Sequence, residues 1–256
     1  MWGGTLPSPR RAALGGLAGL SVALFGNLFG VTSALLSLDG GAAAGDLRLD
    51  VLVPVRGYKR CVDYQNGFEF RYPAVWLADQ RLYRRYAERM ERERGLDPPS
   101  LRAARRVRAQ EAPEPSAGFG PPGGTGEDNI SAIVAPIREG FRLEGMGSPA
   151  EAAQRFLDAT VAPPGSGKRA ELLGAGSRRD AAGELYYTME FTVEAPGRFR
   201  RHNVAAYAAR NGLLFTLNAQ CADARWGALE GAFREAAASF RIISSGAATA
   251  DFPDRL

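Results

Sequence analysis

Residues 201–220 read RHNVAAYAARNGLLFTLNAQ, and this stretch decides the fold. Two apolar runs flank Asn211-Gly212, the residue pair that best suits the positive φ angles of a two-residue hairpin turn. Such a turn predicts an antiparallel hairpin over 201–210 and 213–220. It also fixes the register, which pairs Ala208 with Phe215, Ala206 with Leu217, Val204 with Ala219, and His202 with Cys221.

Three further stretches have the patterns of strands. Residues 185–193 alternate, with one apolar face made of Leu185, Tyr187, Met189, Phe191 and Val193. Residues 130–137 are apolar on both sides, as in a central strand that is covered on both faces. Phe68, Phe70 and Tyr72 alternate with Glu69 and Arg71, which predicts a half-buried strand that Pro73 ends.

Helices are expected before and after these strands. Ser148-Pro149-Ala150-Glu151 combines a capping hydroxyl, a proline at the first helical position and a glutamate that completes a capping box. This helix is expected to bury Ala153, Phe156, Leu157 and Val161, and a final helix carries Trp226, Leu229, Phe233 and Phe240 on one stripe. The fold class predicted is α+β, with an antiparallel sheet sandwiched by helices.

The N-terminus has the layout of an export signal. Arg10-Arg11 precede an uncharged run from Ala12 to Leu38, and Ala42-Ala43-Ala44 offer the small residues of a cleavage site. The paired arginines favour the twin-arginine route, which carries folded proteins. We expect residues 1–44 to be removed before Gly45 rather than kept as an anchor, which leaves residues 45–256 as a single domain.

Basic charge is concentrated in one segment. Residues 79–111 hold ten arginines against six acids, while the net charge of the whole chain is +4. Residues 81–94 have helical periodicity, and residues 112–126 form a Pro/Gly-rich loop. We interpret 79–126 as a partly helical insertion. Its arginines either dock to an acidic partner or to anionic lipid, or they are a solvated helix face, and periodicity alone does not separate these alternatives.

Few residues of the sequence suggest a catalytic or metal-binding site. His202 is the only histidine, and the predicted register places it beside Cys221, with Asp223 two residues further on. Imidazole, thiolate and carboxylate together could hold a zinc-like ion. The alternative is structural, with Asp223 as a helix N-cap and Cys221 as an apolar filler. A disulfide between Cys61 and Cys221 also stays open.

Other site types do not find support. Gly165-Ser166-Gly167-Lys168 lacks the first glycine of a phosphate loop, and Arg169 stands where Ser or Thr would bind magnesium. No serine has a nucleophile motif, so an enzyme is not expected. The excess of arginine over lysine is attributed to a G+C-rich coding bias, and no nucleic-acid partner is expected.

Several segments resemble the PsbP family of extrinsic lumenal proteins of photosynthetic membranes. The similarity spans most of 62–243 outside the insertion. It rests on the order and spacing of Phe68 to Trp76, Asp128 to Val134, Gly147-Ser148-Pro149, Glu184 to Phe191, Arg201 to Val204, Asn211-Gly212, Gln220 to Trp226 and Phe233 to Phe240.

The resemblance implies a fold, a location and a role. The fold is an antiparallel sheet between helical layers, and the location is the lumenal side of the chloroplast thylakoid membrane, which several family members reach by the twin-arginine route. The founding member helps photosystem II, as part of the oxygen-evolving complex, to retain calcium and chloride, and paralogues serve other roles such as photosystem I assembly. The partners implied are photosystem core subunits, bound by a monomeric, peripheral, non-enzymatic protein.

The resemblance also bears on the site and on the insertion. A histidine and an aspartate associated in the family with a divalent metal match His202 and Asp223, so calcium, manganese or zinc is a candidate cofactor, with Cys221 as a third ligand. The alternative function is an exported module that binds a small ligand or metal near His202. The arginine-rich insertion departs from the founding member and favours a paralogue. The residues before Arg10 make a poor transit peptide, which favours a chain that is incomplete at its N-terminus.

Overall fold

The computed structural model describes residues 30–38, 40–79 and 115–243. The chain divides into two compact units, residues 1–61 and 62–256, and strand β1 (Tyr58–Asp63) runs across the division. Arg10, Arg11 and the helix predicted over 81–94 lie outside the described residues. Within the described ranges, no helix combines the length and the apolar character that a membrane crossing requires.

The first unit contains three short helical segments. These are α2 (Val31–Leu35), α3 (Ala42–Asp46) and the 3-10 turn η2 (Leu49–Val51). The predicted cleavage point before Gly45 falls inside α3, and cleavage there stays a prediction. This unit contains a buried ion pair, in which Nε and Nη2 of Arg60 both donate to Oδ2 of Asp50, at 2.9 and 2.8 Å.

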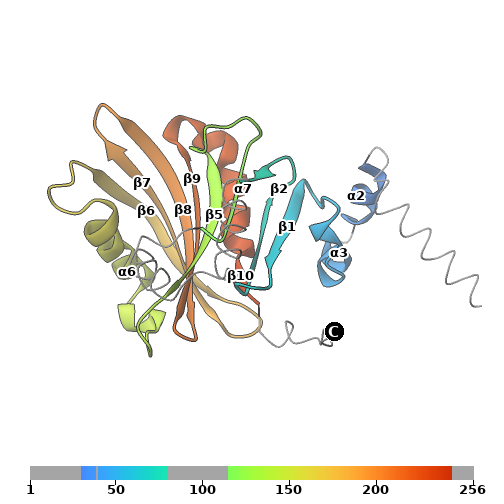
Figure 1. The fold of residues 1–256 in the computed structure, drawn as a ribbon, viewed down its shortest axis with the longest axis horizontal. Coiled ribbons are helices and arrows are strands. Elements are labelled where there is room, and N and C mark those ends of the chain that lie inside the picture. The colour runs from blue at the N-terminus through green and yellow to red at the C-terminus, as the bar shows by residue number, and fades with distance from the viewer. Residues whose placement is uncertain (1–29, 39, 80–114, 244–256) are drawn as a thin grey trace, which may run out of the picture. The chain divides into compact units, whose positions relative to one another are not determined.

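The second unit is built on a seven-stranded sheet in the order β3-β4-β5-β9-β8-β7-β6 (Figure 1). Every neighbouring pair in it is antiparallel, which confirms the predicted kind of sheet. The strands are β3 (Leu77–Ala78), β4 (Ala117–Gly120), β5 (Asn129–Pro136), β6 (Arg169–Arg179), β7 (Leu185–Ala195), β8 (Phe199–Arg210) and β9 (Leu213–Ala222).

The hairpin at the centre of the prediction is confirmed in its turn and in its register. Asn211 and Gly212 have φ angles of 52° and 71°, as a two-residue turn of this kind requires. All four predicted pairs between β8 and β9 are present, including His202 opposite Cys221. The residues that flank this turn therefore determined the centre of the sheet.

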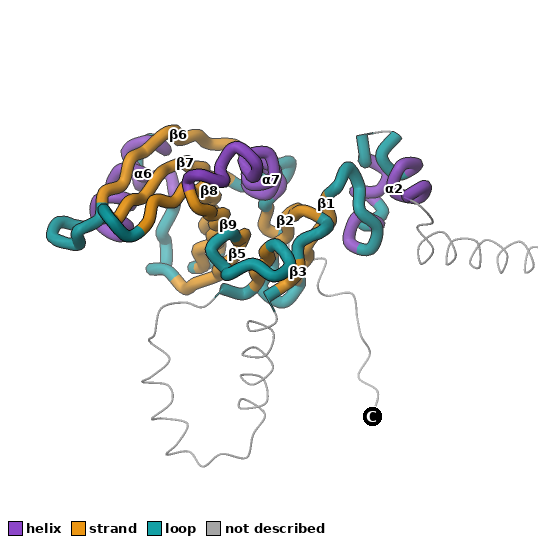
Figure 2. Tube along the Cα trace, turned by 90° about the horizontal axis from the view of Figure 1, so that it is seen from above, coloured by secondary structure: helices purple, strands orange, loops and turns teal. Residues whose placement is uncertain are grey.

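Helices α6 (Pro149–Phe156) and α7 (Trp226–Ser239) pack on opposite faces of the sheet (Figure 2). The predicted capping box at the start of α6 is present, since Ser148 and Glu151 bond reciprocally. The helix continues as the π-helical segment η4 (Leu157–Val161). Ala153 and Leu157 cover Met189, Phe191 and Ala205 on one sheet face.

Helix α7 covers the other face of the sheet. Successive strand residues point to opposite faces, so the neighbours of the residues under α6 point toward α7. Phe233, Ala236 and Ala237 are buried on this side, and the helix packs on β2 (Phe68–Pro73), β8 and β9. The fully buried Phe233 ring meets the rings of Trp76 and Trp226, with centroids 6.1 and 6.2 Å away.

Three sequence predictions are wrong in detail. Within the loop predicted over 112–126, Ala117–Gly120 forms strand β4. Phe119 of this strand is buried and stacks on Tyr72, with ring centroids 3.8 Å apart. The strand of 68–73 is not half-buried in simple alternation, because Glu69 is 2% exposed and forms an ion pair with Arg241. Tyr186, placed on the polar side of its strand, is fully buried.

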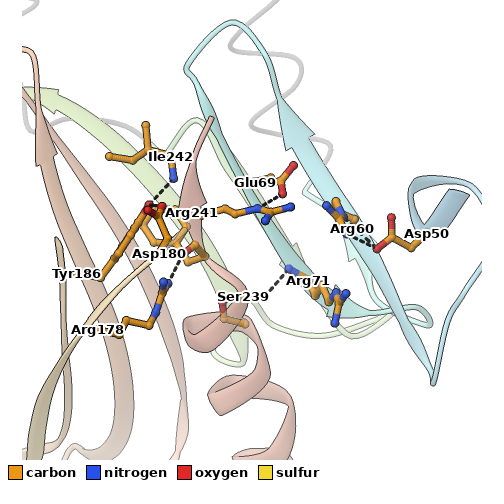
Figure 3. A network of polar contacts seen from close by, with 12 residues as sticks. Asp50, Arg60, Glu69, Arg71, Arg178, Asp180, Tyr186, Ser239, Arg241 and Ile242 are labelled. Carbon is orange, nitrogen blue, oxygen red and sulfur yellow. Dashed lines mark hydrogen bonds and ion pairs between the residues drawn. The ribbon is translucent and has the colours of Figure 1, made fainter. Parts of the chain in front are cut away.

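Strands β1, β3, β6 and β10 (Arg241–Ile242) were not predicted from the sequence. Strand β10 pairs with β2, and Figure 3 shows the side chains that fix it. Tyr186 Oη accepts a hydrogen bond from the Ile242 amide at 2.8 Å and donates to Asp180 Oδ2 at 2.9 Å. Edge strand β6 buries little, and only alternate residues such as Ala170 and Leu172 pack on the α6 side.

Candidate functional site

His202 lies near the end of β8, where three elements meet. Strand β9 ends opposite it, the 3-10 turn η5 (Asp223–Arg225) follows, and α7 begins at Trp226. The imidazole stacks flat on the Trp226 indole, with ring centroids 3.6 Å apart and an angle of 6° between the rings. Because the stacking covers one face of the imidazole, His202 is only 4% exposed.

Both ring nitrogens of His202 face carboxylates. Nε2 is 3.0 Å from Oε1 of Glu190, and Nδ1 is 3.5 Å from Oδ1 of Asp223. Glu190 comes from β7, where it sits diagonally across the ladder from His202 on the same sheet face. His202 and Asp223, the two residues predicted as metal ligands, are therefore brought together, with Glu190 as an additional neighbour.

Arginines bind the outer oxygens of the same carboxylates. Arg200 Nε is 3.0 Å from Asp223 Oδ2, and Arg234 Nη2 is 3.0 Å from Glu190 Oε2. Arg234 also pairs with Glu230 one helical turn earlier, at 3.0 Å. The result is a continuous row of polar contacts that joins β7, β8, η5 and α7 to one another.

Asp223 does not act as a helix N-cap. Neither η5 nor α7 has a side-chain cap bond at its N-terminus, and the residue before η5 is Ala222. The structural alternative considered for Asp223 is therefore wrong in its details, because the carboxylate pairs with His202 and Arg200 instead of with backbone amides.

Cys221 is a weak candidate for a metal ligand. Its side chain is fully buried, and its thiol is free. Burial, and then the nearby charge of Asp128, raise the pKa of the Cys221 thiol to about 11, against the partial effect of Arg225. The thiol is accordingly protonated at neutral pH, whereas a metal needs the thiolate.

The donor set as folded does not have the form of a metal centre. Over the described ranges, no group of three or more His, Cys, Asp or Glu side chains converges in a way that could hold an ion. The two nitrogens of His202 and the outer carboxylate oxygens already have protein partners. A metal at His202 and Asp223 would have to displace these contacts, and it stays a prediction.

Sequence reasoning missed Glu190, Arg200, Arg234 and the stacking role of Trp226. Pro196 and Gly197 mark the turn between β7 and β8, where Gly197 has a φ angle of 71°. Reading that turn as a hairpin would have aligned β7 with β8 and placed Glu190 near His202. The contribution of Arg234 depends on how α7 lies across the sheet, and no local pattern encodes that.

The comparisons with known proteins agree with one another. The PsbP family model matches residues 56–242. The chain is 43% identical over 240 residues to PsbP domain-containing protein 7, chloroplastic, of Arabidopsis thaliana, which covers 92% of this chain and 83% of the relative. It is 24% identical over 190 residues to CyanoP of Synechocystis, covering 74% of this chain and 86% of CyanoP.

A solved structure supports the fold. The solution structure of cyanobacterial PsbP (CyanoP) from Synechocystis matches with a TM-score of 0.51 at 23% identity, covering 74% of this chain and 95% of that one. At this identity the likeness concerns the fold alone. The family match and the relative from Arabidopsis establish that the chain belongs to the PsbP family.

Proposed function

We propose that this chain is a non-catalytic PsbP-domain factor of the thylakoid lumen that acts by contact with a photosystem or with a photosystem assembly intermediate. The observation that carries the proposal is the family match over residues 56–242, which takes in strands β1 to β10 and helices α6 and α7 in full. The layered α-β-α arrangement implied by the resemblance is part of the same proposal.

The arrangement around His202 supports a role without catalysis. A general base needs a free nitrogen within hydrogen-bond reach of a substrate. Here Nε2 contacts Glu190, Nδ1 faces Asp223, and Trp226 covers one ring face. Through these contacts His202 links β8 to the start of α7. Such a structural role is consistent with a domain that acts by surface contact.

The proposal is tested by capture from thylakoid membranes. The tagged chain, expressed with the leader of a lumenal protein, is expected to co-purify with photosystem subunits and to co-migrate with their complexes on native gels. A purely free lumenal pool, or a location on the stromal side in a protease-protection assay, would overturn it.

The structure indicates which residues should be replaced to test the role of the insertion. Deleting 79–126 would remove β4, whereas replacing only 80–114 keeps β3 and β4 as antiparallel partners through Ala78 and Phe119. A short Gly/Ser loop can join them, because antiparallel neighbours accept tight connections. If the insertion docks the protein, this variant folds but no longer co-migrates. If the arginines are only a solvated face, co-migration is unchanged.

Divalent-metal binding is kept as a second proposal. The observation in its favour is that His202 Nδ1 and Asp223 Oδ1 lie 3.5 Å apart in a group that also includes Glu190. Calorimetry with zinc, manganese and calcium on the wild type and on His202→Ala tests it. Binding that the substitution abolishes would support the site, and no heat of binding with any of the three ions would remove it.

A further inference from the structure

A cavity lies between α6 and the sheet, on the face opposite to His202. It has a volume of about 240 Å³, and its lining includes Phe141, Leu143, Met146, Phe156, Met189 and Tyr207. Helix α6 packs on β6 and β7, and the cavity beside it is only partly enclosed. Concave apolar sites of this kind are where proteins bind small hydrophobic molecules.

The lining has one notable polar group. The Tyr207 hydroxyl has no hydrogen-bond partner among the residues that the structure describes, and the ring packs on Phe156 with centroids 5.7 Å apart. Burial raises the pKa of Tyr207, so the hydroxyl keeps its proton and is available as a donor. The hydroxyl is not among the buried polar atoms that lack a partner, so water can satisfy it, and a ligand oxygen could take the place of that water.

A polar hollow adjoins the cavity and shares Phe141 and Leu143 with it. Three arginines, Arg142, Arg179 and Arg210, line this hollow against two glutamates. Ala209, which follows Tyr207 on the same face of β8, lines the polar hollow, so the two hollows are neighbours along this strand.

Arg142 is the least committed of the three cations. Its side chain is 78% exposed and meets Glu144 only at 3.8 Å, whereas Arg179 is 3.2 Å from the same glutamate and Arg210 donates to the Ile243 carbonyl at 3.1 Å. An arginine fork suits a carboxylate, which it can bind through two parallel hydrogen bonds. The polar hollow therefore has an excess of positive charge at the mouth of an apolar cavity.

We propose that this cavity binds a free fatty acid, with the hydrocarbon chain against α6 and the carboxylate at Arg142. The volume fits one medium chain. A water molecule occupies roughly 30 Å³ in the liquid and a methylene group is of similar size, so the cavity holds roughly eight methylene groups. Decanoate has that number of methylene groups.

The test uses the full chain with decanoate and decanol as probes. Calorimetry is expected to show binding of both, with decanoate tighter. Arg142→Gln should weaken decanoate about three- to tenfold and leave decanol unchanged. Arg198→Gln, the same change of charge at the exposed turn at the far end of β7 and β8, should alter neither.

A second measurement places the ligand without relying on a variant that must fold. Met146 and Met189 both line the cavity, so their ¹³C-labelled methyl signals should shift on addition of decanoate. Ala153→Leu, which fills the cavity from α6, should abolish both the shift and the binding. The proposal is overturned if neither probe binds, if the methionine methyls do not respond, or if the chain binds only to phospholipid vesicles and not to monomeric decanoate.

Discussion

Tyr186→Phe removes a single oxygen that joins three parts of the second unit. The hydroxyl accepts from the Ile242 amide at 2.8 Å and donates to Asp180 Oδ2 at 2.9 Å (Figure 3). The ring itself is fully buried, with the Arg178 guanidinium 4.0 Å from its centroid. Phenylalanine keeps the ring, so the substitution tests the hydroxyl alone.

The expected loss follows from the two bonds. A hydrogen bond to a charged group contributes about 1.5–3 kcal/mol, and a buried amide left without a partner costs about 1–3 kcal/mol. Asp180 retains bonds from the amides of Ala182 and Glu184, which reduces the first term. We expect the free energy of unfolding to fall by about 2–4 kcal/mol, on the order of 5–15 °C in Tm for a domain of this size.

Tyr187→Phe is the matched control, one residue along the same strand. Its hydroxyl donates to the Gly147 carbonyl at 2.8 Å in an exposed setting, so the loss should be at most about 1 kcal/mol. Urea unfolding gives both values, and hydrogen exchange at the Ile242 amide should accelerate only in Tyr186→Phe. Equal destabilisation by the two substitutions, or an unchanged exchange rate at Ile242, would refute the reasoning.

Three further outcomes are expected. His202→Phe keeps a ring on Trp226 but loses both carboxylate contacts, so thermal unfolding should show a loss of about 1–3 kcal/mol in the free energy of unfolding. His202→Ala also loses the stacking and should be destabilised more. Equal losses for the two variants would show that stacking contributes nothing. Since the pKa of Tyr207 is raised in the folded state, the unfolded chain releases this proton first, and stability should fall as pH rises above about 10; Tyr207→Phe should flatten that fall in pH-dependent urea unfolding. Gly212→Ala should cost about 1–2 kcal/mol in the same assay, because φ is 71° there, and a neutral result would count against the turn geometry.

The sequence predicted elements whose signals are local. Asn211-Gly212 determined a turn, and a turn of known length determines which residues of β8 and β9 lie opposite each other. The capping box at Ser148 and Glu151 likewise needs only four consecutive residues. These features are predictable because the groups that satisfy one another are close neighbours in the chain.

The errors fall where the stabilising partner is distant in the sequence. Glu69 looked like an exposed residue of an alternating strand, and its burial depends on Arg241, which is 172 residues away. Tyr186 looked polar-facing, and its hydroxyl is satisfied by β10, a two-residue strand that has no periodicity of its own. A polar residue is inexpensive to bury only once such a partner is in place.

The same logic decides how His202 is best interpreted. From the sequence, one histidine beside a cysteine and an aspartate suggested a vacant ligand set, because the partners of those groups were unknown. The fold supplies the partners, with Glu190 on one nitrogen and Arg200 on the far side of Asp223. Each carboxylate also pairs with an arginine, so an incoming cation would have to compete with a protein group of the same sign. These contacts favour a structural role for His202 and its neighbours, which link α7 to the hairpin. A ligand is better accommodated on the opposite face of the sheet, where the cavity beside α6 has room and the Tyr207 hydroxyl has no protein partner among the described residues.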